Sequence, residues 1–406
     1  MRVLIANDKR GYFGGVEQCV SDSVRGLAAR GHACHLVYRS STGRGLERFD
    51  QSFASVHACR ELGAEAPEQP VELSEVVRRV RPDVVYVHKV ESIAPLLELV
   101  GRTSVVRMVH DHDLVCPRRH KYDAFTGYTC QRAAGLRCLL DLAFVERAAG
   151  TGVAFVNVAA RLRELARHRT GLRLLVGSRY MRQELLRNGC DPAGIRVLPP
   201  CVDVRDAPAA PLPEEGRLLY VGQLIRGKGV DLLLSALARL GEGYRLDVVG
   251  TGNAAPALIE TARKLGIDRR VTFHGWTDGP AVSAHFQRAR IAIVPSRWPE
   301  PFGMVGVEAM AHGRAVVAYD VGGIRDWLDH AETGLLVPEQ DVAGLASAID
   351  RLHRVPGLAE AMGEAGRRRY ERDYRYAELV RRLEAELEAA AVGAATVQSS
   401  LEEVSA

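Results

Sequence analysis

Two glutamates in the second half of this 406-residue chain have the type and spacing to bind a polyhydroxylated molecule. Glu300 stands between Pro299 and Pro301, and a residue that precedes proline is held in extended backbone. Glu308 follows within a helix predicted over 305–311. Carboxylate oxygens accept hydrogen bonds from pairs of hydroxyl groups. The alternative, two surface glutamates near a helix start, does not explain the rigid proline frame.

A cationic loop precedes them in YVGQLIRGKGVDLLL, where Arg226 and Lys228 alternate with glycines between a predicted strand and a predicted helix. Two cations beside open backbone amides suit a diphosphate. The loop lacks the glycine spacing and the Ser or Thr of a Walker A motif. A solvated loop with two charges is the alternative.

Two glycine turns are weaker candidates for anion binding. Gly14 and Gly15 stand where a helix should begin, and a helix N-terminus attracts anions. Gly250-Thr251-Gly252 follows a predicted strand but lacks the third glycine of a dinucleotide fingerprint, so a tight turn is the favoured interpretation.

The run His110-Asp111-His112-Asp113 contains pairs that recur at metal sites, but it follows a predicted strand and a catalytic metal is not expected. Downstream, Cys116, Cys130 and Cys138 include no close pair of the kind that structural zinc sites use. His112 or His120 could complete a zinc set, and a disulfide is a further alternative. We expect free thiols.

Basic residues gather in the first half of the chain, where residues 1–208 carry 31 Lys and Arg against 23 Asp and Glu. Arg118, Arg119 and Lys121 form a basic stretch that suits a phosphorylated or lipid-diphosphate acceptor, with a solvated loop as the equal alternative. Residues 161–173 (RLRELARHRTGLR) suggest weak peripheral contact with an anionic membrane, against a solvated helix face. No aromatic residues are interleaved as at nucleic-acid sites, so no nucleic-acid partner is expected.

Composition sets the class of fold. With 47% hydrophobic and 26% charged residues, the chain is neither disordered, collagenous nor a small disulfide scaffold. The sequence contains no run of 18 apolar residues, so no membrane-spanning helix is expected. The N-terminal segment MRVLIANDKR is typical of a first buried strand rather than of a signal peptide. We therefore expect a cytoplasmic protein with reduced thiols.

Short apolar runs alternate with amphipathic segments, which predicts an α/β fold of two doubly wound parallel-sheet domains. The predicted strands of the first half are Val3–Ala6, His35–Tyr38, Val84–His88, Val105–His110, Val153–Val158, Leu174–Gly177 and Ile195–Leu198. Those of the second half are Arg217–Val221, Arg245–Val249, Val271–Phe273, Ile291–Val294, Ala315–Ala318 and Gly334–Val337. Between the halves, residues 199–213 hold five prolines and predict a linker. The boundary is set at 207/208.

Several of these segments together resemble the retaining glycosyltransferases of family 4, which have the GT-B fold. The resemblance rests on FGGVE at 13–17, HDHDLVCPR at 110–118, the Ser at 178 after a strand, LPPCVD at 198–203, VGQL…KGVDLLL at 221–234, the E-x7-E pair at 300–308, VGG at 321–323 and TGLLVP at 333–338. It covers nearly the whole chain and is specific for the family, but not for one reaction.

The resemblance implies two Rossmann-like domains facing each other across a cleft, with residues 1–207 binding the acceptor and residues 208–375 binding the sugar nucleotide. It implies that a helix at 376–392 crosses back to the first domain and that 393–406 is a flexible tail. Glu300 would hold sugar hydroxyls, Glu308 the ribose, and Lys228 the diphosphate. Gly15 would approach the diphosphate and His110 the transferred sugar. The remaining donor-binding candidates are Gln223, Arg226, Gly250, Phe302, Gly303, Met304 and Val305, and the acceptor-binding candidates are Asp111, Asp113, Arg118 and Arg119.

The implied reaction is retaining transfer from a nucleotide-diphosphate sugar, UDP-linked first and GDP-linked second, without a catalytic metal or a cofactor. The acceptor is a hydroxyl of a glycan, lipid-linked or small-molecule compound. The family often has Arg where this chain has Gln223, which puts the usual two-cation clamp in doubt, and Arg226 is the candidate replacement. The alternatives are a non-catalytic nucleotide-sugar-binding subunit and, with less support, a dinucleotide-dependent oxidoreductase.

Overall fold

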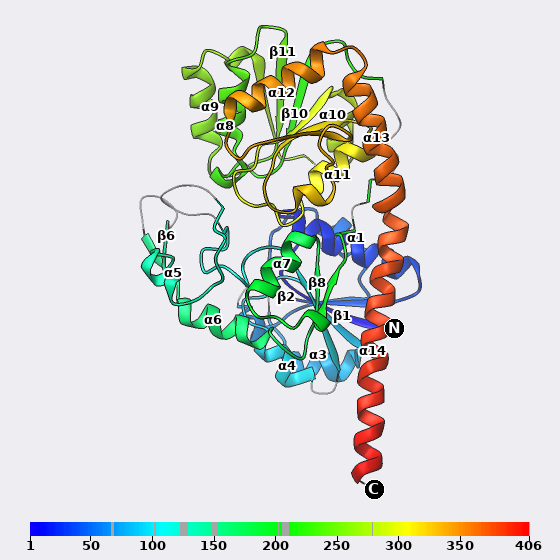
Figure 1. The fold of residues 1–406 in the computed structure, drawn as a ribbon. Coiled ribbons are helices and arrows are strands. Elements are labelled where there is room, and N and C mark those ends of the chain that lie inside the picture. The colour runs from blue at the N-terminus through cyan, green and yellow to red at the C-terminus, as the bar shows by residue number, and fades with distance from the viewer. Residues whose placement is uncertain are drawn as a thin grey trace. The chain divides into compact units, whose positions relative to one another are not determined.

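The computed structural model of the chain describes residues 1–65, 69–100, 103–121, 129–147, 153–201, 203–204, 211–277 and 279–405. They form two compact units, whose elements are labelled in Figure 1. Unit 1 comprises Met1–Arg119, Arg132–Cys201 and Tyr376–Ala406, and unit 2 comprises His120–Gln131 and Val202–Arg375. The predicted boundary at 207/208 lies outside the described residues. Residues 120–131, predicted in the first domain, belong to unit 2, where the Thr129 amide donates a hydrogen bond to Glu339 Oε1 over 3.2 Å.

Unit 1 contains a seven-stranded parallel sheet, and alternate residues of its interior strand β1 are buried in two different apolar clusters. Val3 and Ile5 pack with one apolar cluster, and Leu4 and Ala6 with another. Burial on both faces explains the continuous apolar runs in these strands. In sheet order the strands are β3 (Ser55–Ala58), β2 (Ala33–Ser41), β1 (Arg2–Arg10), β4 (Val84–Val87), β5 (Ser104–Val109), β8 (Arg173–Val176) and β9 (Ile195–Val197).

The helices of unit 1 follow its strands along the chain. They are α1 (Gly15–Ala29), α2 (Leu46–Asp50), α3 (Leu73–Val80), α4 (Ala94–Val100), α5 (Arg137–Leu140), α6 (Val158–Arg167), α7 (Arg179–Arg187) and α14 (Tyr376–Ser405), with 3-10 turns η1 (Arg60–Leu62) and η2 (Pro192–Gly194).

One predicted strand of unit 1 is only partly right, and two strands, β3 and β6, were not predicted. Residues 153–158 do not join the main sheet: β7 (Val153–Phe155) pairs antiparallel with β6 (Val145–Arg147), and Val158 begins α6. The helix starts there because the Asn157 side chain accepts a hydrogen bond from the Ala160 amide. The edge strand β3 was not predicted, because its sequence SVHA has no apolar run.

Unit 2 contains a six-stranded parallel sheet with helices on its faces. In sheet order its strands are β12 (Val271–Gly275), β11 (Tyr244–Val249), β10 (Gly216–Val221), β13 (Ile291–Val294), β14 (Ala315–Tyr319) and β15 (Gly334–Val337). Its helices are α8 (Val230–Leu237), α9 (Ala255–Lys264), α10 (Gly279–Arg288), α11 (Met304–Ala311), α12 (Val342–Arg354) and α13 (Leu358–Asp373), with 3-10 turns η3 (Arg226–Lys228), η4 (Asp268–Arg270) and η5 (Gly322–Asp326). The prediction of two parallel-sheet α/β domains is confirmed.

Helix α14, red in Figure 1, belongs to unit 1, where it packs against α1, β4 and β5. Leu379, Val380 and Leu383 are buried in the core of this unit. A Cβ on Gly26 of α1 would lie 2.4 Å from Val380, so a glycine there allows the two helices to approach closely. Residues 393–405, predicted as a tail, continue the helix, and the absence of proline from this segment permits this. None of the helices in the described ranges is both long and apolar enough to span a bilayer.

Candidate functional site

A buried ion pair in unit 2 joins the two sequence candidates Lys228 and Glu300. Lys228 Nζ lies 2.7 Å from Glu300 Oε1, and the Ser296 hydroxyl donates a hydrogen bond to the same oxygen. The Glu300 side chain is 5% exposed and that of Lys228 is 21% exposed. Lys228 Nζ also lies 5.0 Å from the centre of the Trp298 ring, within cation–π range. The ammonium is thus held at the surface end of a buried carboxylate.

Two opposing effects set the protonation of Glu300. Burial raises the pKa of its carboxyl group, whereas the Lys228 charge and hydrogen bonds from Lys228, Ser296 and Trp298 lower it. The lowering effects prevail, so the pKa lies below its ordinary value. Glu300 is therefore ionised at neutral pH and can accept hydrogen bonds only.

Backbone contacts hold the Lys228 turn against the Glu300 loop. The carbonyl of Gly227 accepts hydrogen bonds from the amides of Arg297 and Trp298, at 3.0 and 3.2 Å. A Cβ on Gly229 (φ +68°) would lie 1.9 Å from the Pro295 carbonyl oxygen, so only glycine permits this approach. These contacts bring together two candidates that are 72 residues apart in the sequence.

The Arg297 side chain adds a second set of contacts between the Glu300 loop and the segment that carries Lys228. Its guanidinium binds both carboxylate oxygens of Asp231, at 2.8 and 2.9 Å, and donates to the carbonyl of Arg226. A two-pronged Arg–carboxylate pair fixes direction as well as distance. Arg226 itself is exposed.

The VGG segment holds the backbone of Glu300. The Gly323 amide donates to the Glu300 carbonyl over 2.6 Å, at the start of η5. Gly322 has φ +58°, and a Cβ there would lie 2.3 Å from the same carbonyl oxygen. The sequence motif is therefore a contact surface for the Glu300 loop.

Trp327 supports the start of helix α11. Its indole N–H donates to the Phe302 carbonyl over 2.6 Å, and a Cβ on Gly306 would lie 1.9 Å from its ring. Gly303, at φ +88°, precedes the first residue of the helix, Met304. The Gly306 amide donates to the Gly303 carbonyl over 3.0 Å. The amides of Met304 and Val305, in the first turn, are the ones that a ligand could use.

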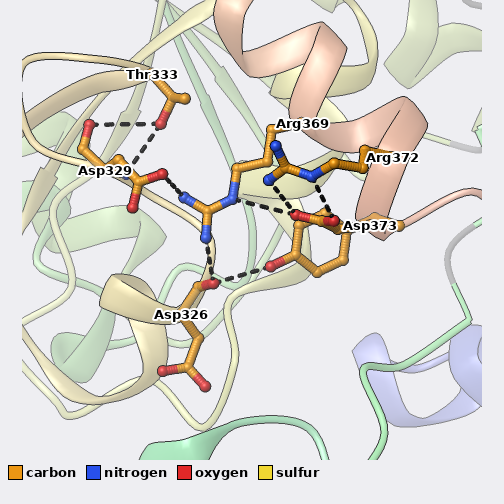
Figure 2. Close-up of polar contacts among 7 residues, drawn as sticks. Asp326, Asp329, Thr333, Arg369, Arg372 and Asp373 are labelled. Carbon is orange, nitrogen blue, oxygen red and sulfur yellow. Dashed lines mark hydrogen bonds and ion pairs between the residues drawn. The ribbon is translucent and has the colours of Figure 1, made fainter.

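Figure 2 shows how helix α13 anchors the segment that carries Trp327. Arg369 forms an ion pair with Asp329 and donates to the carbonyl of Asp326 over 2.8 Å. The Tyr374 hydroxyl donates to the same carbonyl over 2.9 Å. Glu308, the second sequence candidate, is half-buried on α11.

The glycines after β10 and β11 serve close packing between loops. The Gly250 amide donates to the Gly275 carbonyl over 2.7 Å, and a Cβ on Gly250 (φ +135°) would lie 1.9 Å from the Gly222 carbonyl oxygen. The carbonyl of Gln223 accepts from the buried Tyr220 hydroxyl over 2.8 Å. These backbone contacts set the paths of both loops.

In unit 1, the half-buried His110 pairs with a buried histidine, His88, that the sequence did not single out. His88 Nδ1 and His110 Nε2 lie 2.8 Å apart and the rings are stacked. Burial lowers the pKa of both rings, and the Lys89 and Arg107 charges lower that of His110 further, to about 3. Both imidazoles are neutral at physiological pH.

Next to this pair, one lysine serves two carboxylates. Lys89 Nζ lies 2.7 Å from Asp111 Oδ2 and 2.8 Å from Asp113 Oδ2. Burial raises the pKa of Asp113, and the Asp111 charge adds to this. A small pocket lies here, lined by Lys89, His88, His110, Asp111 and Asp113 together with Arg107, Met108, Val109 and Leu114.

The remaining sequence candidates of unit 1 are dispersed. Gly15 begins α1, whose N-terminus already holds a carboxylate, because Glu17 Oε2 accepts from the Gly14 amide over 3.0 Å. The prediction of a basic surface patch is wrong for Arg118, and also for Lys121 of unit 2, because both side chains are buried. Arg118 donates to the carbonyl of Asp141. Arg119 is exposed.

All eight cysteines lie among the described residues, and none of them forms a disulfide. Three groups of side chains among the described residues bring ligand atoms within 4.8 Å of one another: Cys19 with His88 and His110, Asp247 with His274 and His285, and His32 with Glu384 and Glu388. Cys116, Cys130 and Cys138 belong to none of these groups.

Sequence reasoning thus found Lys228, Glu300, His110, Asp111 and Asp113, which the structure brings into two clusters. It missed Ser296 and Trp298, whose signal was adjacency to the proline-framed Glu300. It also missed His88 and Lys89, whose signal was their position directly after β4, at the carboxyl edge of the sheet.

Two family models match the chain: "Glycosyltransferase Family 4" over residues 13–206 and "Glycosyl transferases group 1" over residues 206–369, together most of its length. A glycogen synthase of Mycobacterium tuberculosis is 35% identical over 195 residues, 47% of this chain and 44% of the relative. A D-inositol 3-phosphate glycosyltransferase of Mycobacterium bovis is 39% identical over 189 residues, 43% of this chain and 39% of the relative. The matched part thus spans less than half the length of these curated relatives.

Among solved structures, the Anabaena protein HepE in complex with UDP superposes with a TM-score of 0.71 at 18% identity, over 96% of this chain and all of that one. The same Anabaena protein has also been solved with UDP-glucose. At this identity the likeness shows the fold, two parallel-sheet domains of GT-B type.

Proposed function

Because the chain belongs to the GT-B glycosyltransferases of family 4, we propose that it transfers a sugar from a nucleotide-diphosphate sugar to a hydroxyl group of an acceptor. The observation that carries the proposal is the Lys228–Glu300 pair, an ammonium and an ionised carboxylate 2.7 Å apart beside the N-terminus of α11. The ammonium of Lys228 can bind a diphosphate, and the carboxylate of Glu300 can accept hydrogen bonds from sugar hydroxyls.

We propose that unit 2 binds the donor. Breaking the bond between the anomeric carbon and the diphosphate oxygen leaves positive charge on the sugar ring and negative charge on the leaving group. Lys228 stabilises that negative charge more in the transition state than in the bound substrate, which is the condition for catalysis. Glu300 accepts hydrogen bonds from sugar hydroxyls, Glu308 accepts them from the ribose, and the free N–H groups at the start of α11 face the donor's oxygens.

UDP-linked sugars are the favoured donors and GDP-linked sugars the second choice, and the UDP complexes of the Anabaena protein support this order. We propose that transfer retains the anomeric configuration through attack on the face that the diphosphate leaves, and that it needs no metal ion. In this mechanism the leaving diphosphate accepts the proton of the acceptor hydroxyl.

We propose that unit 1 binds the acceptor at the His88–Lys89–His110 pocket. Asp111 and Asp113 can accept hydrogen bonds from acceptor hydroxyls. The two carboxylates share one ammonium, Lys89, so the pocket favours a neutral or amine-bearing hydroxyl compound over a phosphomonoester. The burial of Arg118 removes one of the cations that had favoured a phosphorylated acceptor.

Two measurements test the proposal. The melting temperature of the full chain is measured with UDP, GDP, their glucose conjugates and NAD; a rise with one of the sugar-nucleotide classes is expected. Mass spectrometry then follows products when that donor is offered with inositol, an aminocyclitol, a glycan and inositol 3-phosphate. A rise in melting temperature without transfer to any acceptor would favour the non-catalytic subunit, and stabilisation by NAD alone would overturn the proposal.

A further inference from the structure

Three potential metal ligands converge in unit 2 outside the residues discussed so far. Asp247 lies on β11, His274 on β12 and His285 on α10. One ligand atom of each lies within 4.8 Å of those of the other two. His274 Nε2 is 2.6 Å from Asp247 Oδ1, and the two imidazole rings are 4.4 Å apart. Three separate elements therefore present ligand atoms to one point.

A bulge in the edge strand aims His274 at this point. The register of the β11–β12 pair runs from Val248 opposite Phe273 directly to Val249 opposite Gly275, so His274 is the additional residue. A bulge leaves its residue outside the ladder and redirects its side chain. The strand backbone is thus shaped around the position of this imidazole.

The chemistry of the three groups suits one class of ion. Two imidazole nitrogens and one carboxylate oxygen are a ligand set of zinc and related divalent transition metals, with a fourth position left for water. His285 is buried, and the centre of its ring lies 4.4 Å from that of His274. Ligand atoms around tetrahedral zinc lie about 3.3 Å apart, so small side-chain rotations complete the site.

Charges around the cluster work in both directions. Asp247 carries one negative charge, while Arg288 Nη2 lies 3.5 Å from His285 Nδ1 and repels a cation.

We propose that Asp247, His274 and His285 bind a divalent transition-metal ion such as Zn²⁺. The ion fastens edge strand β12 and helix α10 to β11. It is structural, is separate from the Lys228–Glu300 cluster, and does not depend on the proposed transferase activity. Strand β12 ends at Gly275, whose carbonyl accepts a hydrogen bond from the Gly250 amide in the loop after β11. By fixing β12, the ion therefore also stabilises the loop after β11, which packs against the loop after β10.

The test uses Zn²⁺ alone with the full chain, by isothermal titration and by metal analysis after dialysis. His274→Ala and the near-isosteric Asp247→Asn should each weaken binding at this site at least tenfold and abolish the associated rise in melting temperature. Arg288→Ala should strengthen binding by about three- to tenfold, because it removes a like charge close to a divalent ion. A merely structural His–Asp hydrogen bond would not respond to Arg288→Ala in this way.

His32→Ala, which dismantles another potential ligand group, is the matched control and should leave this binding unchanged. A crystal soaked in Zn²⁺ should show anomalous scattering between Asp247 and the two histidines. Zinc binding of wild-type affinity and stoichiometry in both His274→Ala and Asp247→Asn would overturn the proposal, as would loss of the binding only in His32→Ala.

Discussion

The two clusters of ionisable side chains, one in each unit, differ in how their charges are paired. In unit 2, Lys228 and Glu300 form a single ion pair, fixed by glycines through which loops approach within hydrogen-bond distance. In unit 1, Asp111 and Asp113 share Lys89, and the adjoining pair His88 and His110 is held neutral by burial.

Because of this difference, the two clusters suit different kinds of ligand. The unit 2 cluster leaves a cation and free helix amides for an anionic ligand. In the unit 1 cluster the charges of Lys89 and Arg107 balance those of Asp111 and Asp113, and neither imidazole is charged, so the cluster suits neutral hydroxyl groups. A transferase that separates a diphosphate from a sugar needs one site of each kind.

The largest effect is expected from the unit 2 pair. Lys228→Ala should lower the rate of transfer by about 10²–10³, because it removes the cation that we propose faces the leaving diphosphate. Glu300→Gln should lower it at least tenfold. Lys89→Ala is the matched change in unit 1 and should raise the acceptor KM more than it lowers kcat. Product formation with saturating donor measures all three, and a melting curve verifies folding. Wild-type turnover in both Lys228→Ala and Glu300→Gln would contradict the site assignment.

The glycine support of Glu300 gives the next effect. Gly322→Ala should destabilise unit 2 by about 1–3 kcal/mol from its positive φ, with a further cost from the 2.3 Å approach to the Glu300 carbonyl, and should reduce transfer. Gly357→Ala is the control, since Gly357 also has positive φ (+74°) but no atom within 4 Å of the added Cβ. Denaturant unfolding measures both variants. Equal losses would show that the close approach does not matter.

A pH effect distinguishes the neutral histidines of unit 1. The pKa of His110 is about 3 in the folded chain against an ordinary value of 6.5, so its contribution to stability is complete above pH 6.5 and is lost as pH falls toward 3. His110→Gln should therefore make the free energy of unfolding fall less steeply over this range. His330→Gln, at an exposed histidine of unit 2, is the control. Identical slopes in wild type and His110→Gln would refute a buried neutral ring.

The smallest effect is expected from metal removal. EDTA should strip ions from the protein yet leave the transfer rate within experimental error, because Lys228 and helix amides face the leaving group. Transfer is measured before and after dialysis against EDTA. A loss of activity that Mg²⁺ or Mn²⁺ restores would instead assign the Asp111–Asp113 cluster to a catalytic metal.

Most strands were predictable because parallel strands covered on both faces need continuous apolar runs, as in β1, β13 and β14. The edge strand β3 was not, since a half-exposed strand of four residues leaves no such run. The strand predicted over residues 153–158 was too long, because an apolar run alone does not reveal that Asn157 caps a helix.

The candidate site was predictable residue by residue but not as an arrangement. Proline and glycine neighbours marked Glu300 and Lys228, whereas their contact across 72 residues depends on tertiary packing. Lys89 lacked any local signal beyond its place after β4, and its two partners lie on the loop after β5. The bulge at His274 is likewise a property of strand pairing that no sequence period encodes.

The return of α14 to unit 1 has a consequence for the order in which the protein is made. Unit 2 is complete once residue 375 has left the ribosome, whereas unit 1 still lacks Leu379, Val380, Leu383 and Leu387 from its apolar interior. Unit 1, whose sheet is synthesised first, can therefore complete its apolar core only after α14 has been synthesised. A fragment ending at Cys201 would expose the vacant apolar face to water and invite aggregation.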